Sequence, residues 1–218
     1  MKRRTGSRPT RKPDVLTFDE PNHEYRWKGA VVPHVTGVID PLVDYSAVPR
    51  GVLEGARQKG KHVHKMVEFW ALGQLDEAGL PAWMRPVLDQ WLKFVKDTGF
   101  IVLASERQVY HPQYDYAGTL DLRGMMTNHP KFRGHGVLDI KRSFMAGAVT
   151  GLQTAAYAEA DDAWGIQEAP HWTDRIAWRG ALKLNENGPY RFEAFEKRSD
   201  FSEFLVCLTY HRLKKKYR

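Results

Sequence analysis

Three strand-like segments follow one another between residues 100 and 143, with a helical pattern on either side. The helix expected before them has apolar residues at helical spacing and ends at Gly99. A second helix is expected at residues 146–165, and a strand pair follows at residues 175–184 and 189–195. Helices and strands in this order predict an α/β (α+β) fold with a central mixed β-sheet flanked by helices.

The remaining segments divide the chain into a basic arm and one folded unit. Residues 1–13 are rich in Arg, Lys, Pro, Ser and Thr, which predicts a disordered basic arm. Residues 14–218 are interpreted as a single domain, which begins with three short strands, the last of them at residues 30–36. A long helix is expected at residues 49–73.

Charge, cysteine content and the lack of a long apolar run limit the partners and sites expected for this chain. The net charge of +7 favours a polyanionic partner through steering and counterion release, the alternative being a solubilising surface. A single cysteine, Cys207, excludes an intrachain disulfide and a four-cysteine zinc or iron–sulfur site, and indicates a reducing, cytoplasmic setting. No apolar run approaches the ~20 residues that span a bilayer, so no membrane partner is expected.

The segment GVLDIKRS, residues 136–143, places two charges at the end of an apolar strand. A period of two puts Asp139 and Lys141 on one face and Ile140 on the other. A hairpin would bring Asp121, in the preceding strand, within roughly 5 Å of Asp139. Two carboxylates at this distance repel and raise each other's pKa unless a cation lies between them, and hard oxygen ligands suit Mg²⁺ or Mn²⁺. The alternative is a cross-strand salt bridge in which Lys141 neutralises one acid.

Further polar residues accompany this segment. His64 and Glu68 lie four residues apart on one helical face, where an acid can complete a metal shell and orient the histidine. Glu106 belongs to the first of the three strands, and Gln153 and Tyr157 share a face of the next helix. Taken singly, each has a structural alternative: a surface contact, an exposed strand residue, or a half-buried helix edge.

Taken in order, these motifs resemble the PD-(D/E)XK nuclease superfamily, and within it the RecB-like branch of phage and recombination exonucleases. The resemblance spans about residues 23–160. Two features differ from the family pattern: Leu120 stands where the first motif carries Pro, and the iron–sulfur cysteines of some relatives are missing. The matching motifs are Gly60…His64 with Glu68, Glu106, Gly118…Asp121, Asp139-Ile140-Lys141 and Gln153…Tyr157.

The resemblance implies a restriction-endonuclease-like core that holds one or two Mg²⁺ or Mn²⁺ ions. The implied metal ligands are His64, Asp121, Asp139 and the backbone carbonyl of Ile140. Lys141 would act on the attacking water, and Glu106 would support a second metal or orient that water, so the implied catalytic set is Asp121, Asp139, Lys141 and Glu106. The implied substrate-binding residues are Gln153, Tyr157, Glu68 and Arg142.

The implied function is a metal-dependent DNA exonuclease of phage-type recombination, repair or processing. Two alternatives stay open: an endonuclease on the same core, and an inactive DNA-binding module. The implied partners are DNA and a recombination or replication protein, in the host cytoplasm if the chain is phage-encoded. The sequence does not determine the oligomeric state. Trp70, Tyr114 and Tyr116 could stack on bases, although a core position is the stronger interpretation.

Overall fold

The computed structural model describes residues 15–142, 147–168 and 174–217. The expected basic arm, residues 1–13, lies outside these ranges. A small antiparallel sheet has the order β1-β2-β3, and a larger sheet has the order β4-β5-β6-β7-β8. The strands are β1 (Leu16–Asp19), β2 (Glu24–Trp27), β3 (Ala30–Val32), β4 (Phe100–His111), β5 (Tyr116–Met126), β6 (Gly134–Lys141), β7 (Trp178–Lys183) and β8 (Arg191–Ala194).

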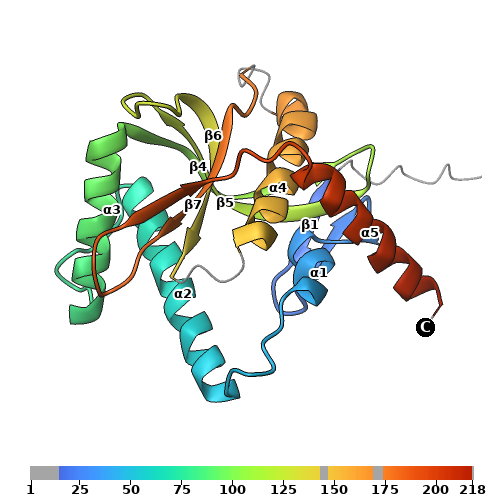
Figure 1. Ribbon diagram of the computed structural model, residues 1–218, viewed down its shortest axis with the longest axis horizontal. Helices are drawn as coiled ribbons and strands as arrows, with labels where there is room; N and C mark the ends of the chain where they lie inside the picture. Colours follow the sequence, from blue (N-terminus) through green and yellow to red (C-terminus); the bar gives the residue numbers. More distant parts are fainter. Residues whose placement is uncertain (1–14, 143–146, 169–173, 218) are drawn as a thin grey trace, which may run out of the picture.

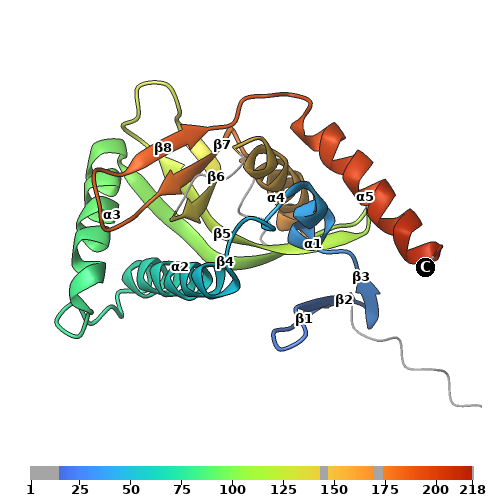
Figure 2. The same ribbon diagram turned by 60° about the horizontal axis from the view of Figure 1, so that its bottom comes forward.

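Five α-helices and two 3₁₀-helices surround the larger sheet in the described part of the chain (Figure 1). One face carries α2 and α3, and the other carries α1, α4 and α5, as the turned view shows (Figure 2). The helices are α1 (Val35–Ile39), η1 (Asp40–Leu42), α2 (Arg50–Ala71), η2 (Ala82–Met84), α3 (Arg85–Thr98), α4 (Gly147–Glu168) and α5 (Asp200–Lys216). None of the described helices is both long and apolar enough to cross a membrane.

The larger sheet is mixed, which confirms the predicted fold class. Strands β4, β5 and β6 pair antiparallel, β6 and β7 pair parallel, and β7 and β8 pair antiparallel. The parallel pair of β6 and β7 needs a crossover connection, which α4 provides. The expected hairpins β5–β6 and β7–β8 are therefore both present.

Each face of the sheet has its own apolar core, because side chains alternate along the strands. On β6, Val137 packs in the core under α1, α4 and α5, while Leu138 packs in the core under α2 and α3. Trp91 of α3 and Phe204 of α5 are fully buried at the centres of the two cores. Residues at the ends of β5 and β6 can therefore reach either layer.

One local prediction was wrong. The β-branched residues of 30–36 suggest a strand throughout, but β3 ends at Val32 and α1 begins at Val35. The side chain of His34 caps this short helix, because its Nδ1 accepts the N–H of Gly37 at 3.1 Å. By contrast, α3 ends as predicted at Gly99, whose φ of +61° is the left-handed conformation that favours glycine.

Candidate metal centre

The candidate site lies where β5 and β6 separate. Backbone pairing between the two strands ends at Leu122 and Leu138, one residue before the two acids. Beyond that pair, Asp121 Oδ2 accepts the N–H of Ile140 at 2.7 Å. The carboxylate thus takes the place of a strand carbonyl, which fixes the orientation of Asp121 at the fork.

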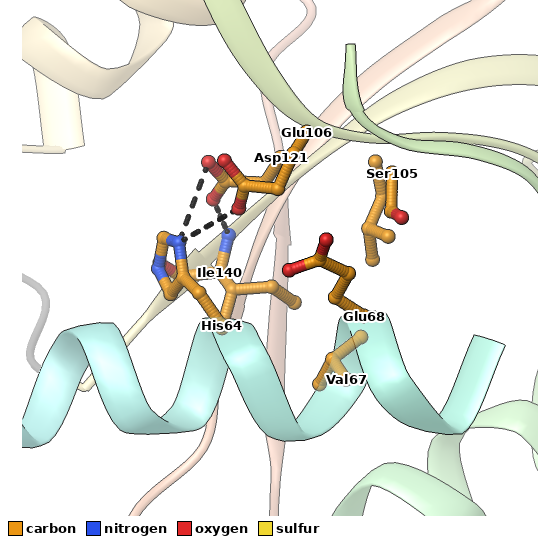
Figure 3. Close-up of a pocket in the computed structure, with 8 residues that line it drawn as sticks. His64, Val67, Glu68, Ser105, Glu106, Asp121 and Ile140 are labelled. Carbon is orange, nitrogen blue, oxygen red and sulfur yellow. Dashed lines mark hydrogen bonds and ion pairs between the residues drawn. The ribbon is translucent and has the colours of Figure 1, made fainter. Parts of the chain in front are cut away.

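Three side chains from three elements converge at this fork. His64 of α2, Glu106 of β4 and Asp121 of β5 each offer one ligand atom, and these atoms lie within 4.8 Å of one another. His64 Nδ1 lies 3.6 Å from Asp121 Oδ1 and 3.7 Å from Glu106 Oε1 (Figure 3). The three residues line one cleft together with Val67, Glu68, Ser105, Leu122 and Ile140.

His64 is oriented by the backbone of β6. Its Nε2 donates to the carbonyl oxygen of Ile140 at 2.9 Å, which turns Nδ1 toward the carboxylates. Burial lowers the pKa of His64, but Asp121, Glu106 and Asp139 outweigh burial and raise it to about 9. The imidazolium therefore supplies the positive charge between the acids in this structure. The Ile140 carbonyl, expected as a metal ligand, accepts the histidine hydrogen bond.

Glu106 has a strained backbone. Its φ is +48°, an uncommon value for a non-glycine residue inside a strand. It lies between the Ser105–Leu122 and Arg107–Leu120 pairs, which places it across from Asp121. Such strain costs roughly 1–3 kcal/mol and is concentrated at functional sites. A left-handed glutamate leaves no signal in the sequence, so sequence reasoning placed Glu106 near the site only through the order of the motifs.

Asp139 is buried beside the three-residue group. Its side chain is 2% exposed, and neither carboxylate oxygen has a hydrogen bond within the described chain. Lys141 Nζ lies 2.8 Å from Asp139 Oδ2 and forms an ion pair with it. Burial raises the pKa of Asp139, and Asp121 adds to this against the opposing effect of Lys141, giving about 6.

These donors fit a hard divalent cation. Buried carboxylate oxygens without hydrogen bonds are costly unless a cation or proton compensates them. Oxygen atoms of Asp121 and Glu106, with one imidazole nitrogen, are a suitable ligand set for Mg²⁺ or Mn²⁺, whereas Asp139 is outside the group whose ligand atoms lie within 4.8 Å of one another. The predicted pair of Lys141 with an acid is also present, but on a buried face rather than a solvated one.

Gln153 and Tyr157 continue the polar chain away from the cleft. Lys141 Nζ donates to Gln153 Oε1 at 3.2 Å, and Gln153 Nε2 donates to Tyr157 Oη at 3.5 Å. Gln153 is 8% exposed and Tyr157 3%. Side chains this buried offer a DNA strand almost no surface, so the expected contact with substrate is revised. Gln153 instead accepts a hydrogen bond from Lys141, and Tyr157 contacts Gln153.

Gly118 connects the Gly118…Asp121 motif with the Gln153…Tyr157 motif through packing. A Cβ at this position would lie 2.6 Å from the ring of Tyr157 and 3.2 Å from Val35. The glycine therefore leaves the space that Tyr157 occupies under β5. Gly60 has no such neighbour, because a Cβ there meets nothing within 4 Å.

The other two expected substrate residues lie at the rim. Glu68 faces the cleft beside His64, but its carboxylate pairs with Lys65 Nζ at 2.6 Å rather than with the histidine (Figure 3). Arg142 forms an ion pair with Glu186, and its guanidinium lies 5.6 Å from the ring centre of Trp83. The expected histidine–acid pair within α2 is therefore not formed.

Sequence reasoning missed the group around Arg142. Lys59 Nζ lies 2.9 Å from Glu186 Oε1 and 5.2 Å from the ring centre of Trp83. One carboxylate thus holds two cations against one indole, close to the α2 turn that carries His64. These residues come from α2, η2 and the β7–β8 connection, and no sequence pattern joins them.

The candidate stacking aromatics belong mainly to the core. Tyr116 is fully buried, and its hydroxyl donates to the carbonyl oxygen of Ala156 at 2.8 Å. Trp70 packs against Trp91 with 5.3 Å between ring centres. The stronger interpretation from the sequence, a core position, is confirmed for both residues.

Comparison with known proteins yields weak structural likeness only. No model of a known protein family matches the chain, and neither does any curated protein. Among solved structures, it is similar to LHK-Exo in complex with dAMP, at 13% identity over 84% of this chain and 87% of that chain, with a TM-score of 0.37. It is also similar to an alkaline exonuclease (LHK-Exo) from Laribacter hongkongensis, at 15% identity over 84% and 91%, with a TM-score of 0.31. Likeness at this level establishes no shared function.

Proposed function

We propose that this chain is a divalent-metal-dependent DNA nuclease, and specifically an exonuclease that hydrolyses phosphodiester bonds. One observation carries the proposal: His64, Glu106 and Asp121 converge at a strand fork, and the buried Asp139 forms an ion pair with Lys141 at the end of the adjoining strand. The basic composition and the order of the motifs support DNA as the substrate.

Asp121, Asp139 and Glu106 would hold Mg²⁺ or Mn²⁺, with His64 as the ligand at the edge of the site. When bound, the ion lowers the pKa of a coordinated water and neutralises charge on the phosphate. A cation in this position would compensate the acids in place of the imidazolium of His64. His64 Nε2 would keep its hydrogen bond to Ile140 and so keep the ring in position.

Lys141 supplies the second positive charge. Burial lowers its pKa, but Asp139 and Asp121 outweigh burial and raise it, so the ammonium group keeps its protons. Gln153 and Asp139 hold Nζ from two sides. We therefore assign Lys141 the role of a donor that orients the water and stabilises developing phosphate charge, rather than that of a general base.

The proposed reaction is balanced as a hydrolysis. The oxygen of water bonds to phosphorus, and the bond from phosphorus to the leaving sugar oxygen breaks. One proton of the water passes to solvent, and the leaving oxygen takes a proton from solvent. Lys141 contributes charge stabilisation in this scheme and undergoes no net change.

The test compares labelled linear and circular DNA. Wild-type protein is expected to degrade linear DNA with Mg²⁺ or Mn²⁺ and to be inactive in EDTA. Asp139→Asn and Lys141→Met should each lower the rate by about a hundredfold or more. The matched controls are Asp89→Asn and Lys93→Met, because both residues lie on the exposed face of α3 away from the cleft.

Each outcome separates the alternatives. Circular DNA that stays intact supports an exonuclease, whereas nicked circles identify an endonuclease on the same core. Equal inactivity of wild type and variants, with DNA binding retained, would identify a binding module instead. Assignment to phage-type recombination or repair, with a recombination or replication protein as partner in the host cytoplasm, belongs to the same proposal and is supported by the motif order alone.

A further inference from the structure

The C-terminal half of α5 projects from the body of the molecule (Figure 1, Figure 2). Its N-terminal half packs into the core through Phe204 and Leu208. On the outer face, large apolar side chains recur at spacings typical of one helical stripe. The stripe comprises Val206, Tyr210, Leu213 and Tyr217, with exposed fractions of 69%, 57%, 48% and 75%.

Lysines and a histidine surround the aromatic members of this stripe. His211, Lys214 and Lys215 line a cavity of about 220 Å³ together with Tyr210, and α1 and η1 form its opposite wall. Lys216 Nζ lies 5.2 Å from the ring centre of Tyr217. Asp40 is the one acidic residue among those that line the cavity in the described chain.

The pKa of a neighbouring histidine, His34, is affected by this positive charge. Burial lowers the pKa of His34, and His23, His211 and Lys215 lower it further, to about 4. Arg212 is committed to the fold, because it donates to the carbonyl oxygens of Tyr114 and Asp115. The local field therefore favours an anionic ligand at the open side of α5.

We propose that this surface binds single-stranded DNA, with Tyr210 and Tyr217 stacking on bases and His211, Lys214 and Lys215 contacting phosphates. Exposed aromatic rings among cations are the usual basis of single-strand binding, because an unpaired base presents a flat face for stacking. A duplex hides those faces, which is why the tyrosines favour a single strand. The inference rests on the proposed function, since it names a second region where the nuclease holds its substrate or product.

The test measures binding of a fluorescent oligothymidylate of about 20 nucleotides in EDTA, where no cleavage occurs. Tyr210→Ala/Tyr217→Ala should weaken binding by about tenfold or more, while Tyr210→Phe/Tyr217→Phe, which keeps both rings, should bind like wild type. Lys214→Ala/Lys215→Ala should reduce the slope of log affinity against log salt by about 1.4, since each phosphate contact contributes ~0.7. Lys93→Ala/Lys131→Ala removes two other exposed lysines and should leave the slope unchanged.

The outcomes distinguish this inference from the proposed function. Normal binding by the alanine pair, an equal loss in the phenylalanine pair, or an equal loss on blunt duplex would overturn the single-strand site even if the protein cleaves DNA. A protein that never cleaves DNA, but whose single-strand binding depends on both tyrosines, would refute the proposed nuclease activity and support the single-strand site on this surface.

Discussion

At the scale of single residues, the candidate centre contains two energetically unfavourable features. Asp139 is buried with Lys141 as its ion-pair partner, and Glu106 has a strained φ of +48°. Neither feature helps the chain to fold, because burial disfavours the ionised acid and the strain costs free energy. Both are understandable if a cation completes the site.

Asp139→Asn should make stability in EDTA less dependent on pH. The folded-state pKa of Asp139 is raised from 3.8 to about 6, so its stabilising contribution is fully present below about pH 4 and lost as pH rises through about 6. The amide does not titrate, so this difference in stability between acidic and neutral pH, which we expect to be on the order of 1–3 kcal/mol, should be missing from the variant. Urea unfolding at both pH values measures it, with Asp89→Asn as the control that keeps the wild-type difference. An unchanged pH dependence in Asp139→Asn would contradict the electrostatic account.

His64 should make stability fall with alkaline pH. Its folded-state pKa is raised from 6.5 to about 9, so its stabilising contribution is complete below pH 6.5 and lost as pH rises through about 9. In His64→Asn this part of the decline should be missing in EDTA. Thermal melts across that range provide the measurement, and an unchanged slope in the variant would show that His64 is not the titrating group.

At the scale of elements, the divergence of β5 from β6 and the position of α4 create the site. The ladder stops at Leu122 and Leu138, and the side chain of Asp121 then bonds the backbone of β6. On the other face, α4 brings Gln153 under Lys141, and Tyr157 fits because Gly118 has no side chain. Helix packing and strand separation therefore determine the position of the lysine together.

A matched pair of Gly→Ala variants tests this packing. Gly118→Ala should destabilise the protein by about 1–3 kcal/mol, because its Cβ would overlap the Tyr157 ring. Gly60→Ala lies inside α2 with open space around it, so it should stabilise by up to about 1 kcal/mol. Denaturant unfolding of both variants gives the comparison. Similar effects from the two substitutions would mean that Gly118 is not a packing requirement.

At the scale of the whole molecule, one buried ion-pair network joins the sheet to α4. Asp161 of α4 accepts from Arg107 of β4 at 2.8 Å and from Arg123 of β5 at 2.6 Å. Arg123 is 2% exposed, and it also contacts His135 and the carbonyl oxygen of Asp174. The network holds α4 against the sheet, and α4 carries the residues that support Lys141.

Asp161→Asn should be severely destabilising. The substitution removes the carboxylate shared by two arginines, one of them buried, and breaking such a pair costs about 3–5 kcal/mol. Calorimetric or urea unfolding against Asp89→Asn measures the loss. A change within the range of ordinary surface substitutions would show that Arg107 and Arg123 find other compensation.

The sequence predicted most elements because their signals are local. Periodicity and a terminal glycine located α3, and an apolar run ending in Asp139 and Lys141 located β6. The same signals failed at residues 30–36, where a side-chain cap from His34 overrode the β-branched pattern. Local patterns could not predict this, because the cap depends on how the chain turns after β3.

The sequence alone determined which acids, histidine and lysine are available to the site and the order in which strands and helices present them. The tertiary structure alone decided their relations. It placed His64 between Asp121 and Glu106, buried Gln153 and Tyr157 next to Lys141, and left Tyr210 and Tyr217 outside the core. The physical reason is that burial and orientation depend on strand divergence and helix packing, which arise from contacts between residues far apart in the chain.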